Sequence, residues 1–291
     1  MTAPVFKSAE AASAVAALYR KVLDQWPVPK TEYRLDTCRG ETFVIACGPE
    51  TALPVLLLHG SMANSAAGME DTALWSQKFR VYAVDMIGEP GFSAPARPPL
   101  DSDAHALWLD DVLEGLGLSR AAFVGTSLGG WLALDYAKRR PHAVERLALV
   151  CPAGIGRRKN FLLKALPLFL FGAWGRERVK RMVFGPAPEQ VPPGARPFHE
   201  LMETIGNAIR PRVVTIPCLT DEELRRLDMP MLVIIGGRDA LIDSADTRRR
   251  LERLAPHADI RFHENGYHYL PGQAPVIFEF LQQGVAERRH G

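Results

Sequence analysis

Hydrophobic residues follow two alternating patterns along this chain. Short continuous apolar runs alternate with segments whose apolar positions recur every three or four residues. The runs predict strands and the spaced segments predict helices. The predicted strands are residues 33–36, 42–46, 54–58, 80–84, 121–124, 146–150, 231–235 and 259–263. The predicted helices are residues 5–26, 104–116, 128–139, 244–254 and a last one that begins at about residue 275.

The strands are continuous apolar runs, whereas a sheet with one wet face would show alternation. Continuous runs are typical of parallel strands that crossover helices bury on both faces. The pattern therefore predicts an α/β fold with a mostly parallel central sheet flanked by helices.

Residues 155–226 interrupt this rhythm with the apolar stretch 161–174 and the Pro/Gly-rich stretch 185–197. We expect a core of residues 1–154 and 227–291 and a helical lid of residues 155–226. Loops after the carboxyl ends of parallel strands surround the site of such folds, which favours a lid over it. The alternative is that residues 155–226 are a structural insertion with no role in function.

Composition and charge exclude several classes of protein. The 291 residues are 47% hydrophobic and 23% charged, which is typical of a folded chain with a large core. A formal net charge of +2 argues against a nucleic-acid partner. The stretch 161–174 is shorter than the roughly 20 residues of a membrane-spanning helix, so stable membrane insertion is not expected. The first residues lack the order of a secretory signal, which predicts a cytoplasmic protein.

The four cysteines predict neither a metal cluster nor a disulfide framework. They lie at positions 38, 47, 151 and 218 with irregular spacing and no C-x-x-C pair. We expect no metal and no cofactor, and a monomer or homodimer.

A G-x-S-x-G pattern at residues 125–129 carries the candidate nucleophile, Ser127. It lies between a predicted strand and a predicted helix. A sharp turn there would hold the serine out beside a base, and it needs small residues two positions to either side, as Gly125 and Gly129 provide. A phosphate-binding loop would carry a lysine after its glycines, which this stretch lacks.

Six stretches in their order along the chain resemble the α/β-hydrolase superfamily, in particular its lidded carboxylesterase-like branch. They are PVLLLHGSM, VYAVDMIGEPGFS, VGTSLGGWLAL, LALVCPAG, MPMLVIIGGRD and ENGYHYL. The resemblance covers most of residues 30–290 outside the insertion. It implies a hydrolase, and a serine at the turn counts against the dehalogenases and epoxide hydrolases of this superfamily, which use aspartate.

The resemblance also implies an acid and then a histidine downstream of the nucleophile. Asp239 follows a late strand and is the expected acid; Asp243 is the alternative, and it could equally cap the next helix. His268 follows the last strand and is the expected base, with His263 as the alternative. The histidines at positions 105, 142, 199 and 257 are expected to face solvent.

Two backbone N–H groups are expected to form an oxyanion hole. The first is that of Leu128, after the nucleophile. The second comes from the His59-Gly60-Ser61-Met62 stretch that resembles the family's loop, with Ser61 favoured over Met62. We expect His59 to order this loop by hydrogen bonding rather than to transfer a proton.

The loop at residues 85–93 departs from the family's D-x-x-G-x-G-x-S pattern. It carries one extra residue and has Pro90 where a glycine is expected. We expect Asp85 to organise this loop.

The expected substrate is a small carboxylic ester with an apolar acyl or alcohol group. Apolar side chains of the insertion would form the pocket together with the loop after the predicted strand 54–58. The expected contacts are His59, Gly60, Phe161, Leu168 and Trp174. Trp131, one turn into the helix after Ser127, is expected in the core. A lactonase, a C–C bond hydrolase, a thioesterase and a non-catalytic ligand receptor of the same fold remain alternatives.

Overall fold

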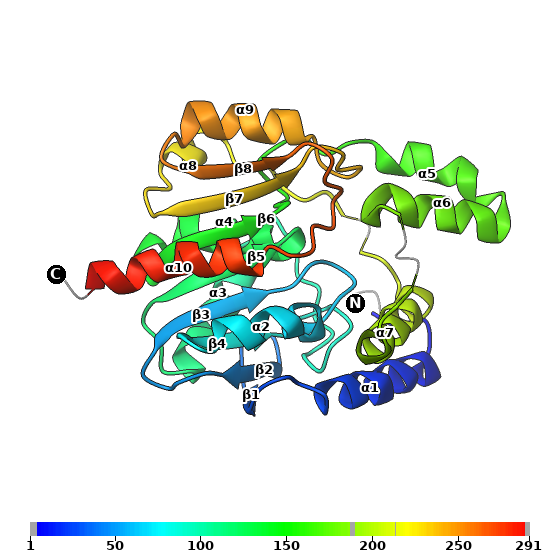
Figure 1. Ribbon diagram of the computed structural model, residues 1–291, viewed down its shortest axis with the longest axis horizontal. Coiled ribbons are helices and arrows are strands. Elements are labelled where there is room, and N and C mark those ends of the chain that lie inside the picture. The colour runs from blue at the N-terminus through cyan, green and yellow to red at the C-terminus, as the bar shows by residue number, and fades with distance from the viewer. Residues whose placement is uncertain (1–4, 187–189, 213, 289–291) are drawn as a thin grey trace.

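The computed structural model describes residues 5–186, 190–212 and 214–288, and its centre is one eight-stranded sheet (Figure 1). The strand order is β1-β2-β4-β3-β5-β6-β7-β8. β1 and β2 are antiparallel to their neighbours and all other pairs are parallel. The strands are β1 (Lys30–Leu35), β2 (Thr42–Cys47), β3 (Leu53–Leu58), β4 (Phe79–Val84), β5 (Ala121–Thr126), β6 (Val144–Val150), β7 (Met231–Gly236) and β8 (Asp259–His263).

Ten α-helices are described around this sheet. They are α1 (Ala9–Leu23), α2 (Met69–Trp75), α3 (Ala104–Gly115), α4 (Leu128–Arg139), α5 (Phe161–Phe169), α6 (Gly172–Phe184), α7 (Arg196–Ala208), α8 (Asp221–Arg225), α9 (Ser244–Leu254) and α10 (Ala274–Arg288). The predicted α/β fold class is confirmed. Every predicted strand and helix is present, with ends shifted by a few residues. The seven-residue α2 has no counterpart in the sequence-based prediction, and α5, α6, α7 and α8 lie in the insertion, for which no individual helix was predicted.

The two faces of the sheet bury separate cores, as the side-chain alternation of strands requires. In β2, Val44 and Ala46 join the core under α3, α4 and α9, whereas Phe43 and Ile45 join the core under α1, α2 and α10. Figure 1 shows α2 and α10 on the near face and α3 and α4 behind the sheet. Burial on both faces explains why the strands read as continuous apolar runs.

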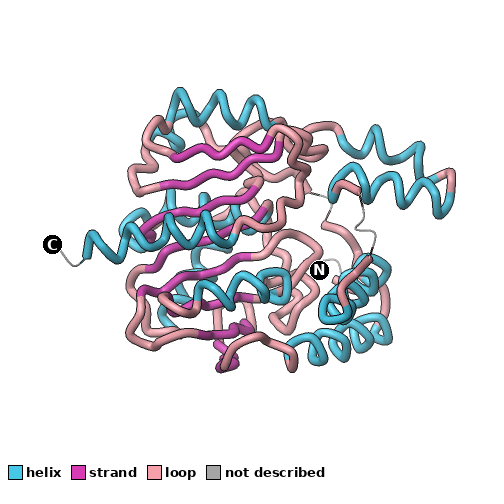
Figure 2. The backbone as a smooth tube through the Cα atoms, in the orientation of Figure 1, coloured by secondary structure: helices cyan, strands magenta, loops and turns pink. Residues whose placement is uncertain are grey.

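Helices α5, α6, α7 and α8 all lie in the segment between β6 and β7. Figures 1 and 2 show α5 and α6 projecting away from the sheet, and α7 lying beside α1. Backbone hydrogen bonds join the start of α1 to the end of α7: Lys7 N–H to the Ala208 carbonyl (2.9 Å) and Arg210 N–H to the Val5 carbonyl (2.7 Å). The division into core and lid at residues 155–226 stays a prediction.

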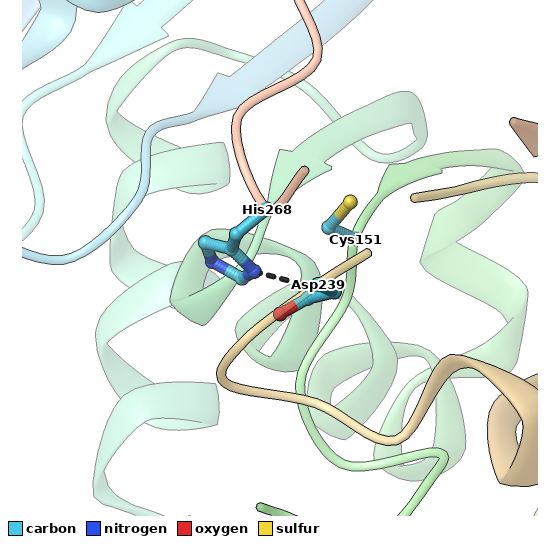
Figure 3. Close-up of side chains that lie close together, drawn as sticks. All are labelled: Cys151, Asp239 and His268. Atoms are coloured by element: carbon cyan, nitrogen blue, oxygen red, sulfur yellow. Dashed lines mark hydrogen bonds and ion pairs between the residues drawn. The ribbon is translucent and has the colours of Figure 1, made fainter. Parts of the chain in front are cut away.

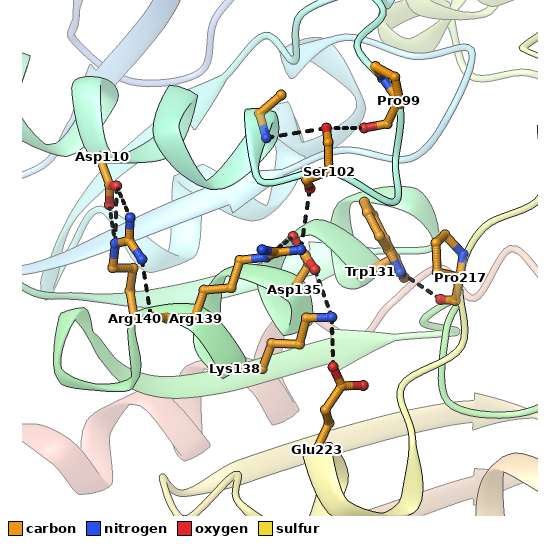
Figure 4. Close-up of polar contacts among 11 residues, drawn as sticks. Pro99, Ser102, Asp110, Trp131, Asp135, Lys138, Arg139, Arg140, Pro217 and Glu223 are labelled. Atoms are coloured by element: carbon orange, nitrogen blue, oxygen red, sulfur yellow. Dashed lines mark hydrogen bonds and ion pairs between the residues drawn. The ribbon is translucent and has the colours of Figure 1, made fainter.

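Helix α4, which begins just after Ser127, is fixed to that same segment by polar contacts (Figure 4). The indole N–H of Trp131 donates to the Pro217 carbonyl at 2.8 Å, and Lys138 pairs with Glu223 at 3.2 Å. Trp131 is buried, so its predicted core position is confirmed. Within the described ranges, no helix is both long and apolar enough to cross a bilayer.

Candidate active site

Ser127 lies in the turn between β5 and α4 with a backbone conformation that is rare for a residue with a side chain. Its φ is 53° and its ψ is −109°. Such strain costs about 1–3 kcal/mol and persists only where the surroundings enforce it. Here Ser127 N–H donates to the Val150 carbonyl at 3.0 Å, and the Ser127 carbonyl accepts from Trp131 N–H at 3.0 Å. Both bonds hold the turn in place.

The two glycines of the pattern lie where a side chain would collide with the backbone. A Cβ on Gly125 would lie 2.6 Å from the Gly129 carbonyl oxygen, and a Cβ on Gly129 would overlap the carbonyls of Leu58 and His59. The turn therefore requires small residues at both positions, as the sequence predicts for a sharp turn around Ser127.

Three predicted side chains meet at this turn. His268 Nε2 lies 2.9 Å from Ser127 Oγ, and His268 Nδ1 lies 2.6 Å from Asp239 Oδ2. Figure 3 shows the imidazole facing the carboxylate, with the two residues on separate loops that follow β7 and β8. The other carboxylate oxygen, Oδ1, accepts the N–H groups of Leu241 (2.7 Å) and Ile242 (3.0 Å). The carboxylate is thus buried, fully hydrogen-bonded and oriented toward the imidazole.

The alternative residues occupy other roles. Asp243 caps α9 by accepting the Asp246 N–H at 3.1 Å, and His263 lies exposed in the edge strand β8. The expectation that His105 faces solvent is wrong: it is buried on α3, with its ring 6.2 Å from that of Trp131. Burial lowers the pKa of His105 to about 3, because the charged imidazolium would lose its water there.

Cys151 lies beside this pair (Figure 3). A ligand atom from each of Cys151, Asp239 and His268 lies within 4.8 Å of the others, a spacing that could in principle hold a metal ion. Burial, followed by the nearby Asp239 charge, raises the pKa of the Cys151 thiol to about 12. A metal needs the thiolate, and both imidazole nitrogens already have hydrogen-bond partners. The donor set therefore suits an acid–base pair rather than a metal.

The loop after β3 brings backbone N–H groups close to the nucleophile. A Cβ on Gly60 would lie 3.8 Å from the Cβ of Ser127, so this loop passes directly beside the serine. The N–H of Met62, which has a φ of 60°, donates to Glu89 Oε2 at 2.7 Å. The N–H groups of Leu128 and Ser61 have no acceptor among the described residues.

His59 orders this loop. Its Nε2 accepts the Met86 N–H at 3.0 Å, so the ring proton is on Nδ1, which donates to the Gly60 carbonyl at 2.7 Å. Burial lowers the pKa of His59. Both ring nitrogens are used in loop contacts, as expected for a residue that positions the backbone.

Asp85 and Glu89 support the loop from the segment after β4. Asp85 is buried and accepts hydrogen bonds from the Tyr19 hydroxyl (2.8 Å), the Ser65 hydroxyl and N–H, and the Phe92 N–H. Glu89, only 3% exposed, was not predicted from the sequence. The signal for it was the departure from the family pattern at residues 85–93, because the altered stretch carries this carboxylate.

The predicted pocket residues of the insertion differ in their exposure to solvent. Phe161 and Leu168 are half-buried, whereas Trp174 is 64% exposed and packs edge-on against Phe171 at the turn between α5 and α6. A substrate contact for Phe161, Leu168 and Trp174 stays a prediction.

Comparisons of the sequence and of the structure with known proteins both agree with this fold and this candidate active site. Carboxylesterase YbfK of Bacillus subtilis (strain 168) is 30% identical over 270 residues, which cover 92% of this chain and 90% of that protein. The crystal structures of carboxylesterase CesB (YbfK) and of naproxen esterase, both from Bacillus subtilis, each superpose with a TM-score of 0.80 at 27% identity. They cover 95% of this chain and 98% and 99% of theirs.

A comparison with a protein-family model supports the same assignment without depending on any single relative. The model described as the alpha/beta hydrolase family matches residues 55–278, which begin in β3 and end in α10. The match includes the turn with Ser127 and the loops with Asp239 and His268. By its sequence, its sheet and its relatives, this chain belongs to the α/β-hydrolase family.

Proposed function

We propose that the chain is a serine carboxylesterase that cleaves small esters with an apolar acyl or alcohol group through an acyl-enzyme. The observation that carries the proposal is the pair of hydrogen bonds that connects Asp239 through His268 to Ser127. Similarity to Carboxylesterase YbfK along most of both chains supports the ester as substrate class.

The hydrogen bonds support one direction of proton transfer. A carboxylate only accepts, so His268 Nδ1 carries the proton that it donates to Asp239. Nε2 is then free to accept the Ser127 proton as Oγ attacks the ester carbonyl. Asp239 holds the ring in this tautomer and stabilises the imidazolium that forms.

The oxyanion of the tetrahedral intermediate would be held by the N–H groups of Leu128 and Ser61. Preorganised donors of this kind contribute a few kcal/mol to the transition state. The Met62 N–H already donates to Glu89, which favours Ser61 as the second donor. The amino end of α4 adds its positive dipole at the same place.

The intermediate collapses as its C–O bond to the alcohol breaks and His268 gives the leaving oxygen its proton. Water then attacks the acyl group on Ser127 and loses its proton to His268, and the acid leaves as Oγ recovers a proton. The proposed cycle needs no metal and no organic cofactor. We propose that residues 155–226 act as a lid over this site.

The test compares wild type and Ser127→Ala on p-nitrophenyl esters of increasing acyl length. We expect the variant to lose activity by roughly 10⁶-fold, because the nucleophile and its base act as a unit. A fluorophosphonate probe should label wild type on Ser127 and leave the variant unlabelled. Unchanged turnover by Ser127→Ala would refute the proposal, provided the two proteins melt at similar temperatures.

Lactones, thioesters and C–C-linked diketones belong in the same substrate panel. Turnover of one of these with no ester cleavage would replace the esterase by a lactonase, thioesterase or C–C bond hydrolase. Tight ligand binding with neither turnover nor probe labelling would indicate a receptor. A cytoplasmic location and a monomeric or homodimeric state remain predictions from the sequence.

A further inference from the structure

Among the described residues, the largest group of solvent-exposed apolar side chains lies on the α5–α6 hairpin, which we define as residues 161–184. In α5, Leu163 and Leu166 lie on one side of the helix, opposite the buried Ala165, and Leu170 just after the helix continues this side; the three are 60–87% exposed. Exposed residues in and beside the turn between the helices continue this surface: Phe169, Leu170, Phe171 and Trp174.

This apolar surface is also strongly basic. Residues 157–181 contain eight Lys and Arg and a single Glu, a formal charge of +7, whereas the whole chain carries +2. Glu177 pairs with Arg181 at 3.1 Å, while Arg176 and Arg178 are exposed and have no acidic partner among the described residues. The remainder of the chain is therefore acidic, and the positive charge is concentrated in the hairpin and in the residues just before it.

The hairpin is firmly packed and both of its ends reach the candidate active site. Gly175 lies so close to the Leu168 carbonyl that a Cβ would overlap it, which brings α5 and α6 together. Before α5, Lys159 Nζ donates to the Asp239 carbonyl at 2.6 Å. At the end of α6, the Val183 carbonyl accepts the N–H of Tyr269, next to His268, at 3.3 Å.

We propose that the α5–α6 hairpin binds the surface of an anionic lipid bilayer. Leu170, Phe171 and Trp174 at its turn would enter the interfacial region, where Trp and Phe are favoured, while Arg176 and Arg178 pair with lipid phosphates. Each Lys or Arg near such a surface contributes attraction that salt screens. The nine-residue α5 is too short to span the bilayer, so the hairpin lies in its surface.

Charge favours a bilayer over a second copy of the chain. The hairpin itself contains five Lys and Arg and one Glu, so two hairpins placed against each other would bring two segments of +4 together, which opposes association at moderate salt. An anionic bilayer instead complements both the charge and the apolar side chains. Because both ends of the hairpin contact the loops with Asp239 and His268, docking would place the candidate active site at the lipid surface.

Co-sedimentation with vesicles tests this directly. Ser127→Ala protein is mixed with vesicles of phosphatidylcholine alone or of phosphatidylcholine with phosphatidylglycerol. Since this variant lacks the proposed nucleophile, its binding is independent of the proposed function. We expect it to sediment with the anionic vesicles only, and to be released as salt is raised from about 0.1 M toward 1 M.

Substitutions assign the binding to the hairpin. Leu170→Ser with Trp174→Ser should weaken binding about tenfold or more, because the apolar insertion is lost. Arg176→Gln with Arg178→Gln should weaken it roughly 30-fold at low salt. The control Leu107→Ser replaces an apolar residue on α3 that is 38% exposed, and should bind as the parent does. Circular dichroism confirms that each variant is folded.

Three results would overturn the proposal. The first is failure to sediment with anionic vesicles, and the second is equal binding to neutral and anionic vesicles. The third is binding that the hairpin variants leave unchanged. A dimer in analytical ultracentrifugation that Trp174→Ser dissociates, without vesicle binding, would assign the surface to a second copy instead.

Discussion

Replacement of Glu89 by glutamine should change how the stability of the protein depends on pH. Glu89 is buried, its Oε2 accepts the Met62 N–H, and its Oε1 has no hydrogen-bond partner among the described residues. Burial raises the pKa of Glu89 from 4.5 to about 7, against the opposing effects of the Met62 N–H and of Arg97 and Arg212. Glutamine has nearly the same shape and can still accept from Met62.

The sign and size of the effect follow from this raised pKa. Below pH 4.5 the carboxyl is protonated in both the folded and the unfolded chain, and its contribution to stability is fully present. As pH rises toward 7 the unfolded chain loses its proton and the folded chain keeps it, so stability falls. A difference of about 2.5 pKa units corresponds to about 3 kcal/mol lost by the time pH passes 7.

Urea unfolding of wild type and Glu89→Gln across about pH 5 to pH 8 measures this difference. We expect the free energy of unfolding of Glu89→Gln, relative to wild type, to rise by roughly 2–3 kcal/mol over that range. Other titrating groups cancel in the comparison. Glu50→Gln, at an exposed position, controls for loss of one negative charge. Parallel pH curves for wild type and Glu89→Gln would refute the reasoning.

Three further substitutions test the site and its supports. Gly125→Ala places a Cβ 2.6 Å from the Gly129 carbonyl, so we expect a loss of about 1–3 kcal/mol in urea unfolding and slower ester cleavage; wild-type values for both would contradict the close approach. Asp85→Ala leaves the Tyr19 and Ser65 hydroxyls without their acceptor, and should cost about 3 kcal/mol or more; a melting temperature equal to wild type would show that they find other partners. Asp239→Asn should keep the fold and lower kcat for p-nitrophenyl esters by about 10⁴-fold, and a small effect would exclude it as the partner of the imidazole.

The sheet and the turn around Ser127 could be predicted from the sequence because their signals are local. Parallel strands buried on both faces give continuous apolar runs, and the glycines at 125 and 129 are dictated by the backbone of the same turn. Asp239 and His268 were predicted by the order of motifs in a resembling family. Their distance from Ser127 depends on three loops that only the folded sheet brings together.

Features that depend on contacts between distant segments were missed. The role of Glu89 arises where the loops after β3 and β4 meet, and helical periodicity on α3 does not reveal that His105 faces another helix. The apolar composition of the stretch 161–174 predicts pocket lining, and that contact stays a prediction. Periodicity shows that a helix has an apolar side, but not whether any element packs on it, and here Leu170 is 87% exposed.

Helix α1 acquires its partners late during synthesis from the amino end. The Tyr19 hydroxyl bonds to Asp85, 66 positions further on, and Lys7 Nζ bonds to the Asn207 carbonyl, 200 positions further on. A ribosome that delivers the chain in order releases α1 long before α7 exists to cover it. Helix α1 is therefore among the last of the described helices to complete its packing, and its apolar side must be kept from aggregation until α7 has been made.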